Sequence, residues 1–273
     1  MHTGKKILLL STALIITTLL WSCGGGTKKS DPNHIKVGVS SGPEYNVAQV
    51  AQQVAKTKYG LDVELVAFND YVMPNAALNQ GDLDINVYQH KPFLDEQCRQ
   101  RGYKLVPVGN TFVFPIAGYS KKIKNIADIQ PQSTIVIPND PTNGGRSLLL
   151  LQKIGLLQLK DGVGLLPKVI DITGNPKELR ILELEAPQLP RALDDEHVTV
   201  AIINNTFAGK AGLVPSRDGL FVEDSKSPYV NLVVAREDNK TEEKVKKFVQ
   251  AYQSPEVAQA AEKEFKGGAI KGW

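Results

Sequence analysis

The sequence predicts an α/β protein with two lobes joined by two extended crossover segments. From His34 onward, stretches with apolar residues at every second position alternate with stretches that have apolar residues three and four apart. The alternation occurs in two runs, roughly 34–110 and 123–211. Strand-like segments at 112–120 and 229–237 are expected to connect the runs. Alternating strands and helices are typical of a mostly parallel sheet with helices on both faces.

The first run shows clear ends to its helices. The expected strands are 34–41, 61–68, 83–89 and 103–110, and the expected helices are 43–59, 73–80 and 92–101. Gly60, Gly81 and Gly102 directly follow these helices. A glycine just past a helix is common because it adopts the left-handed conformation without strain.

The second run repeats the pattern. Its expected elements are a short helix at 125–129, a strand at 133–138, a helix at 144–154, a helix at 189–195 and a strand at 198–204. Helices at 241–253 and 255–265 close the chain. We therefore expect one lobe to contain residues 34–113 and 231–273, and the other to contain residues 114–230.

Residues 1–22 have the features of a signal peptide. Lys5 and Lys6 precede an uncharged apolar run, 7–21, which suits a signal-peptide core and is short for a membrane span. The run ends in "LLWSC", where a small residue precedes Cys23, as in the lipobox of bacterial lipoproteins. We expect Cys23 to be lipidated and 23–33 to form a flexible tether. The alternative is an uncleaved anchor in which the cysteine is incidental.

The overall composition argues against nucleic-acid binding and against catalysis. The net charge is +3, and without Lys5 and Lys6 there are 30 basic residues against 29 acidic ones, so no basic stripe remains. The chain contains no G-x-S-x-G, H-E-x-x-H, Walker or post-strand G-x-G-x-x-G motif. Its four histidines show no metal-ligand spacing. We expect a protein that is not an enzyme and that uses no metal or cofactor.

Polar residues follow several predicted strands, at the ends where α/β sheets bind ligands. Arg146 and Asn143 follow the strand at 133–138 and together could receive a small carboxylate, which arginine grips through paired hydrogen bonds. Asn204 and Asn231 could offer carbonyl oxygens to an ammonium group. A cation near a helix start needs an anionic partner, and the ligand would supply it. The alternative is a surface ion pair between Arg146 and Asp140.

Aromatic residues also follow these strands. Tyr71, Tyr88 and Phe93 could form the wall of a pocket for an uncharged side chain, and His90 lies among them in the sequence. Each also has a structural explanation, as part of the core or as an ordinary loop residue. Together with the polar set, they predict a binding site for a zwitterionic amino acid with an apolar or thioether side chain.

Long segments of the mature chain resemble the NlpA/MetQ family of lipid-anchored substrate-binding proteins. They include "HIKVGV", "KYGLDVELV", "YQHKP", "GYKLVPVGNTFVFPIAGYSKKI", "GLLP", "LELEAPQLPRALDD", "SPYVNLVVAREDNK" and "GGAIKGW". The resemblance extends from about Asn33 to Trp273. It implies a type II periplasmic-binding-protein fold that holds methionine, L or D, between two lobes. It also implies delivery of methionine or a related small apolar amino acid to an ABC permease and its ATPase.

The resemblance also implies roles for individual residues. The family's positions fall here on Arg146 for the ligand carboxylate, on Asn143, Asn204 and Asn231 as polar partners, on Tyr71, Tyr88 and Phe93 as an aromatic wall, and on His90 beside the thioether. The chain departs from the family at Gly144, where a leucine is common. Because glycine weakens a helix by up to about 1 kcal/mol, we expect a less preorganised helix start.

The expected location is the bacterial cell envelope. The chain would be a monomer anchored by lipid at the inner or outer membrane, and would face the periplasm or the exterior. A different function remains open, namely a surface or structural lipoprotein of the same fold whose small-molecule pocket is altered or vestigial.

Overall fold

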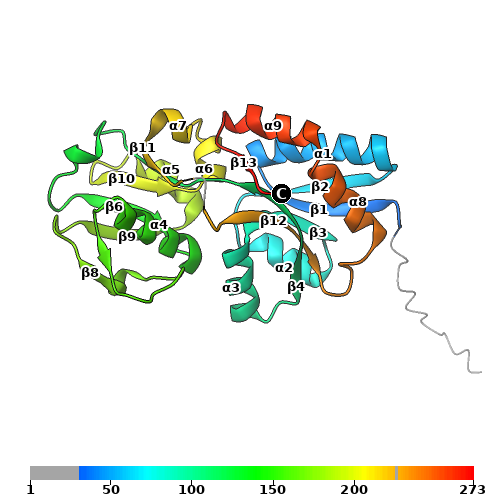
Figure 1. Ribbon diagram of the computed structural model, residues 1–273, viewed down its shortest axis with the longest axis horizontal. Coiled ribbons are helices and arrows are strands. Elements are labelled where there is room, and N and C mark those ends of the chain that lie inside the picture. The colour runs from blue at the N-terminus through cyan, green and yellow to red at the C-terminus, as the bar shows by residue number, and fades with distance from the viewer. Residues whose placement is uncertain (1–30, 225–226) are drawn as a thin grey trace, which may run out of the picture. The chain divides into compact units, whose positions relative to one another are not determined.

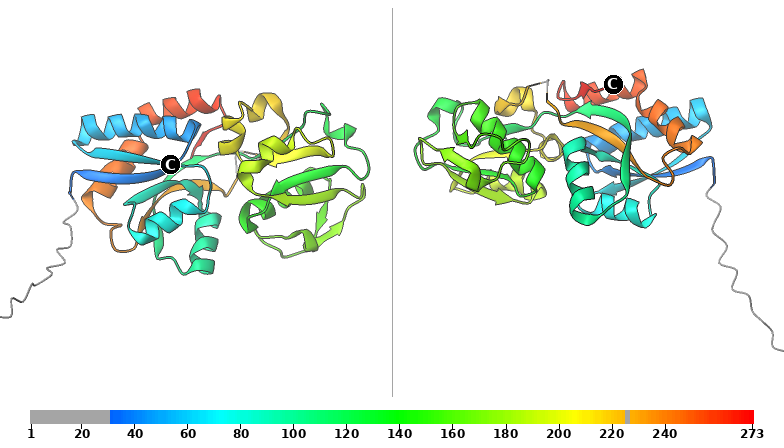
Figure 2. Two further views of the ribbon diagram at one scale, coloured as in Figure 1. Left: turned by 180° about the vertical axis from the view of Figure 1, so that it is seen from behind. Right: turned by 60° about the horizontal axis from the view of Figure 1, so that its bottom comes forward.

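The computed structural model describes residues 31–224 and 227–273, which form two main β-sheets with their own helices (Figures 1 and 2). The expected signal peptide, Cys23 and the tether up to Ser30 lie outside the described residues. No helix among the described residues is both long and apolar enough to cross a membrane.

The first sheet has six strands in the order β13-β4-β12-β3-β1-β2. Their bounds are β1 His34–Ser40, β2 Asp62–Phe68, β3 Ile85–His90, β4 Leu105–Val113, β12 Val230–Arg236 and β13 Ile270–Lys271. Strands β1, β2 and β3 pair in parallel, whereas β12 pairs antiparallel with both β3 and β4.

Helices cover both faces of the first sheet. They are α1 Pro43–Tyr59, α2 Met73–Gln80, α3 Lys91–Arg101, α8 Glu243–Tyr252 and α9 Pro255–Phe265. Alternate side chains of β12 point to opposite faces, so Val233 packs with α1, α8 and α9 while Val234 packs with α2 and α3. We call this sheet and these helices the first lobe.

The second sheet has five strands in the order β11-β5-β10-β6-β9. Their bounds are β5 Ala117–Tyr119, β6 Thr134–Pro138, β9 Arg180–Leu184, β10 Val198–Ile203 and β11 Gly219–Val222. The associated helices are α4 Pro141–Lys153, α5 Leu189–Ala192, α6 Asn205–Lys210 and α7 Pro215–Asp218. Ile135 and Ile137 of β6 pack with the leucines of α4, and Val136 between them packs with α5 and α6. This sheet and its helices form the second lobe.

Short elements complete the second lobe. They are the two-stranded sheet of β7 Gln158–Leu159 and β8 Ile172–Gly174, and the 3-10 turns η1 Ile126–Asp128, η2 Val169–Asp171 and η3 Ala186–Gln188.

The structure corrects three expectations about the fold. Each main sheet is parallel on one side and antiparallel on the other, so the sheets are mixed rather than mostly parallel. The stretch 229–237 is mainly β12, an inner strand of the first sheet, rather than a crossover. Helix α4 begins at Pro141 rather than near Gly144, because Asp140 accepts hydrogen bonds from the backbone N–H groups of Thr142 and Asn143.

The chain passes between the two sheets through residues 114–116 and through residues 223–229, of which 225 and 226 are not described. The backbone N–H of Glu223 donates to the Ile116 carbonyl at 2.9 Å. The two connecting segments are therefore bonded to each other.

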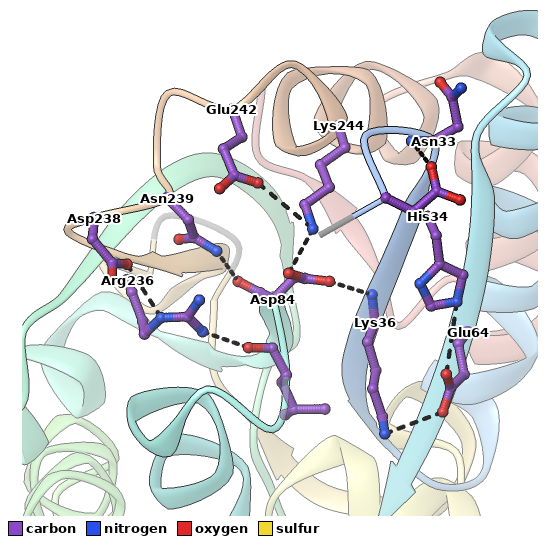
Figure 3. Close-up of polar contacts among 12 residues, drawn as sticks. Asn33, His34, Lys36, Glu64, Asp84, Arg236, Asp238, Asn239, Glu242 and Lys244 are labelled. Carbon is purple, nitrogen blue, oxygen red and sulfur yellow. Dashed lines mark hydrogen bonds and ion pairs between the residues drawn. The ribbon is translucent and has the colours of Figure 1, made fainter. Parts of the chain in front are cut away.

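A polar network stabilises one edge of the first lobe (Figure 3). The Lys244 ammonium is buried and contacts Asp84 at 2.7 Å and Glu242 at 3.6 Å. Asp84 also accepts from the Lys36 backbone N–H at 2.8 Å. The network joins α8 to β1 and to the start of β3, so it has a structural role.

A carboxyl group of the first lobe is buried against the second lobe. Glu44, in the first turn of α1, is 3% exposed, and its side chain accepts a hydrogen bond from the Thr206 hydroxyl of α6. Burial raises the pKa of Glu44 from 4.5 to about 7, although Thr206, Ser40 and the Lys210 ammonium act in the opposite direction. Glu44 is therefore partly protonated near neutral pH.

This burial predicts a pH-dependent stability. The folded protein binds the Glu44 proton more tightly than the unfolded chain does, so the free energy of unfolding should fall as the pH rises from about 4.5 to about 7. Glutamine mimics the neutral acid. When the pH is raised from 4 to 8, the free energy of unfolding of Glu44→Gln should therefore rise by about 3 kcal/mol relative to that of the unmodified protein. The figure follows from about 1.36 kcal/mol per unit of pKa shift.

Urea unfolding at a series of pH values measures this difference. The control is Glu262→Gln on α9, which removes an exposed carboxylate and should leave a curve parallel to that of the unmodified protein. A constant difference between Glu44→Gln and the unmodified protein across this pH range would contradict the account.

Candidate functional site

A cavity lies between the two lobes. The residues that line it are Tyr71, Tyr88, Gln89, His90, Phe93, Phe114, Asn143, Arg146, Asn204, Asn205, Thr206 and Asn231. All eight residues predicted from the sequence are in this set, and the structure brings them together from both lobes.

Arg146 is buried in the second turn of α4, with its side chain only 3% exposed. Its Nε donates to Oε1 of Glu223 at 3.0 Å, and its Nη2 donates to Oε2 of Glu223 and to the Phe114 carbonyl. The guanidinium carbon lies 4.3 Å from the centre of the Tyr229 ring. Among the described residues, no hydrogen bond engages Nη1, so this nitrogen can still donate to a ligand.

The alternative prediction, a surface ion pair between Arg146 and Asp140, was wrong. The carboxylate of Asp140 caps α4 and accepts from the Asn143 side chain, and the anion beside Arg146 is Glu223. Glu223 follows β11, a strand that was not predicted, and lies 77 positions along the chain from Arg146. No pattern in the sequence indicated this pairing.

Asn143 connects the two lobes through its side-chain oxygen. Its Oδ1 lies 3.1 Å from Nε2 of His90 and accepts from Nδ2 of Asn204 at 2.8 Å. Nδ1 of His90 accepts from the Phe93 backbone N–H at the start of α3. The proton of the ring therefore resides on Nε2. Burial, together with the nearby Arg146, lowers the pKa of His90 to about 3, so the ring stays neutral.

Asn204 and Asn231, two of the asparagines that line the cavity, have side-chain oxygens that can accept from a ligand. Asn204 occupies the N-cap position of α6, but its side chain makes no capping hydrogen bond, and its amide nitrogen donates to Asn143. Its Oδ1 is buried without a partner among the described residues. The amide nitrogen of Asn231 donates to the Tyr88 carbonyl at 3.2 Å, which leaves its oxygen as an acceptor. A buried acceptor without a partner favours a ligand that brings a donor.

Three aromatic rings line the apolar part of the cavity. Tyr71 and Tyr88 have ring centres 5.8 Å apart, and Phe93 lies 6.0 Å from each of them in edge-to-face contacts. The Tyr88 hydroxyl donates to the backbone carbonyl of Tyr71, which fixes the Tyr88 ring. Burial raises the pKa values of both tyrosines, so their hydroxyls remain neutral. Tyr71 also packs on Phe207 of the second lobe at 4.9 Å.

Gly144 lies in tightly packed surroundings. A Cβ added there would lie 2.8 Å from the Pro138 carbonyl oxygen, so the backbone would have to shift to accept a side chain. Glycine lets α4 lie close to the end of β6. The expected loosening of the helix start remains a prediction.

Among the described residues, no cluster of three or more His, Cys, Asp or Glu residues is arranged to hold a metal ion. Among the described residues, the cavity is lined by one cation, Arg146, and by amide groups and aromatic rings. The anion that holds Arg146, Glu223, does not line the cavity. This arrangement suits binding of a small ligand that carries both a negative and a positive group.

Several known proteins are similar to this chain in sequence and in fold. The chain is 66% identical to the D-methionine-binding lipoprotein MetQ of Yersinia pestis, over 98% of both chains. The crystal structure of the methionine-binding protein MetQ is 68% identical, covers 89% of this chain and 99% of its own, and superposes with a TM-score of 0.88. The fold is therefore that of the periplasmic binding proteins.

Two further solved structures are similar. A nutrient-binding protein from Burkholderia cenocepacia bound to methionine is 49% identical, with a TM-score of 0.85 over 88% of this chain and all of its own. A periplasmic substrate-binding protein of an ABC transporter from Coxiella burnetii is 46% identical, with a TM-score of 0.84 over 87% of this chain and all of its own. The model of the NlpA lipoprotein family matches residues 35–273, and this chain belongs to that family.

Proposed function

We propose that this protein is the substrate-binding protein of an ABC importer and binds methionine, L or D, between its lobes. The observation that carries the proposal is that Nη1 of Arg146 and Oδ1 of Asn204, in residues that line one cavity, both lack a hydrogen-bond partner among the described residues. These two atoms complement the carboxylate and the ammonium of an amino acid. Three relatives that are 49–68% identical to this chain are described as binding methionine, which supports the same ligand.

The ligand carboxylate accepts hydrogen bonds from Nη1 of Arg146 in this proposal. The guanidinium is planar, and Glu223 already engages its Nε–Nη2 edge. An incoming carboxylate therefore finds a donor whose direction is fixed before binding. A receptor ordered in advance loses less conformational entropy when the ligand binds.

The ligand ammonium donates to Oδ1 of Asn204 and of Asn231. Asn204 is held in place through Asn143, whose amide nitrogen is bound to the Asp140 carboxylate. His90 cannot repel the ammonium because its ring is neutral.

The side chain of methionine lies among Tyr71, Tyr88 and Phe93, with His90 beside the sulfur. Sulfur–aromatic contacts contribute roughly 0.3–1.5 kcal/mol, so they favour a thioether over a plain alkyl chain only modestly. Burial of the chain itself contributes more, about 0.8 kcal/mol for each CH₂ group. The site therefore selects against short side chains.

Nothing in this arrangement requires catalysis. Besides Tyr71 and Tyr88, whose hydroxyls stay neutral, the ionisable side chains that line the cavity are those of Arg146, which is bound to Glu223, and of His90, which both Asn143 and the Phe93 N–H engage. We propose that the protein is not an enzyme and that it delivers its ligand to an ABC permease and ATPase. The similarity to the Coxiella substrate-binding protein supports this partner.

Calorimetric titration with L-methionine, D-methionine and alanine tests the proposed ligand. Methionine should bind and alanine should bind poorly, because alanine leaves the aromatic wall unfilled. Mass spectrometry of acid extracts of the purified protein would identify any amino acid that copurifies. Absence of binding for every amino acid tested would favour a structural lipoprotein with a vestigial pocket.

Replacing Arg146 should abolish tight binding. Truncation of one partner of a buried charge pair costs about 2–5 kcal/mol, so Arg146→Met should weaken methionine binding roughly 30-fold to several-thousand-fold. The same substitution leaves Glu223 without its partner, so the unfolding free energy should also fall by about 3 kcal/mol.

A double variant separates the two effects. Arg146→Met combined with Glu223→Gln removes both buried charges, so stability should recover while methionine binding stays weak. Arg191→Met, on the exposed surface of α5, is the control and should change neither property. Methionine affinity at the level of the unmodified protein in Arg146→Met would refute the proposed role of this arginine.

We also propose that Cys23 carries the lipid and anchors the protein to a membrane. The family's designation as lipoproteins supports this proposal. Cys23→Ser should lose incorporation of labelled fatty acid and should leave the membrane fraction. Cys98→Ser, which replaces the other cysteine, should keep both properties. Normal acyl labelling of Cys23→Ser would contradict the assignment.

A further inference from the structure

Glu223 controls the charge that the cavity presents, although it does not line the cavity. Its carboxylate lies against Nε and Nη2 of Arg146. The side chains of Arg146 and Glu223 are only 3% and 12% exposed, so water screens the pair weakly. The positive charge of Arg146 is largely balanced before a ligand enters.

Three other ionisable groups near the cavity, Asp140, Glu44 and His90, either bind a neighbouring group or are neutral. Asp140 caps α4 and binds the amide nitrogen of Asn143, and the helix N-terminus offsets part of its charge. Glu44 binds the Thr206 hydroxyl, and His90 is neutral. Among the described residues, Glu223 is thus the anion in direct contact with Arg146, the cation that lines the cavity.

This arrangement has a consequence for selectivity. An unbalanced arginine attracts any carboxylate, including one on a molecule that has no ammonium group. With Glu223 beside Arg146, a net-negative ligand meets both an attractive and a repulsive charge. A zwitterion carries no net charge, so the repulsion between Glu223 and its carboxylate is offset by the attraction between Glu223 and its ammonium group.

We propose that Glu223 is a specificity-determining residue, which makes the site select zwitterionic amino acids over the corresponding anionic hydroxy acids. The inference rests on the proposed binding of methionine between the lobes. The proposed function accounts for selection of the ligand by the shape and sulfur of its side chain, and this inference adds selection by its net charge.

The test compares three ligands that share one side chain. Methionine is a zwitterion, 2-hydroxy-4-(methylthio)butanoate is an anion with a hydroxyl in place of the ammonium, and methionine amide is a cation without the carboxylate. Dissociation constants are measured by calorimetry for the unmodified protein, Glu223→Gln, Glu223→Asp and Asp224→Asn. The measured quantity is the ratio of each analogue's affinity to that of methionine, because a general loss of site geometry weakens all ligands together.

Glu223→Gln should raise the hydroxy acid's affinity relative to methionine by on the order of tenfold. The reason is that the substitution removes a negative charge close to the ligand carboxylate, at a site where water screens charges weakly. The same variant should lower the relative affinity of the amide. Glu223→Asp keeps the charge and should keep the ratios of the unmodified protein even where all affinities fall. Asp224→Asn removes the neighbouring exposed carboxylate, which contacts Lys153, and should also leave the ratios unchanged.

Two failures can be distinguished. If the unmodified protein binds none of the three ligands, the proposed function is wrong. If it binds methionine but Glu223→Gln leaves the ratios unchanged, or shifts them no more than Asp224→Asn does, the role of Glu223 is overturned and methionine binding stands.

Discussion

The Arg146 guanidinium is held by groups that all come from the two segments connecting the sheets. The Phe114 carbonyl belongs to the first segment, and Glu223 and Tyr229 belong to the second. A bond from the Glu223 backbone to Ile116 ties the segments together. The proposed carboxylate receptor is therefore attached to the part of the molecule where the lobes would pivot. Any rotation of one lobe against the other must displace this cluster or turn about it.

Further polar contacts cross between the lobes. The His90–Asn143 contact lies at the cavity itself, and the Glu44–Thr206 bond joins α1 to α6. Both pairs are buried in the structure, so the lobes are in a closed arrangement around the cavity. Opening would expose these groups to water. A ligand that bridges Arg146 and Asn204 on one side with Tyr71 and Tyr88 on the other stabilises the closed arrangement through its differential contacts.

Much of the first lobe follows from local patterns. The helix α1 shows regular apolar spacing and ends at Gly60, which has a left-handed conformation with φ of 63°, so its extent could be predicted closely. The position of β12 could not be predicted, because periodicity reveals that a segment is a strand but not which strands it pairs with. Its place between β3 and β4 depends on contacts more than a hundred residues apart in the sequence.

In the candidate site, too, local sequence patterns predict some features, and long-range contacts determine the others. Residues that follow strands could be recognised from the chain, since the ends of parallel strands converge at one edge of a sheet. The partner of Arg146 could not, because Glu223 follows a short strand of only four residues, β11, that has no distinctive pattern. The neutral state of His90 likewise depends on burial and on the Phe93 N–H, which only the folded chain brings into contact with the ring.

The most direct test is a crystal structure of the protein with methionine bound. The account predicts a ligand carboxylate oxygen about 3 Å from Nη1 of Arg146, while Nε and Nη2 stay on Glu223. It also predicts the ammonium beside Oδ1 of Asn204 and the thioether among Tyr71, Tyr88 and Phe93. Methionine bound with its carboxylate away from Arg146, or an Arg146 that leaves Glu223 to reach the ligand, would contradict it.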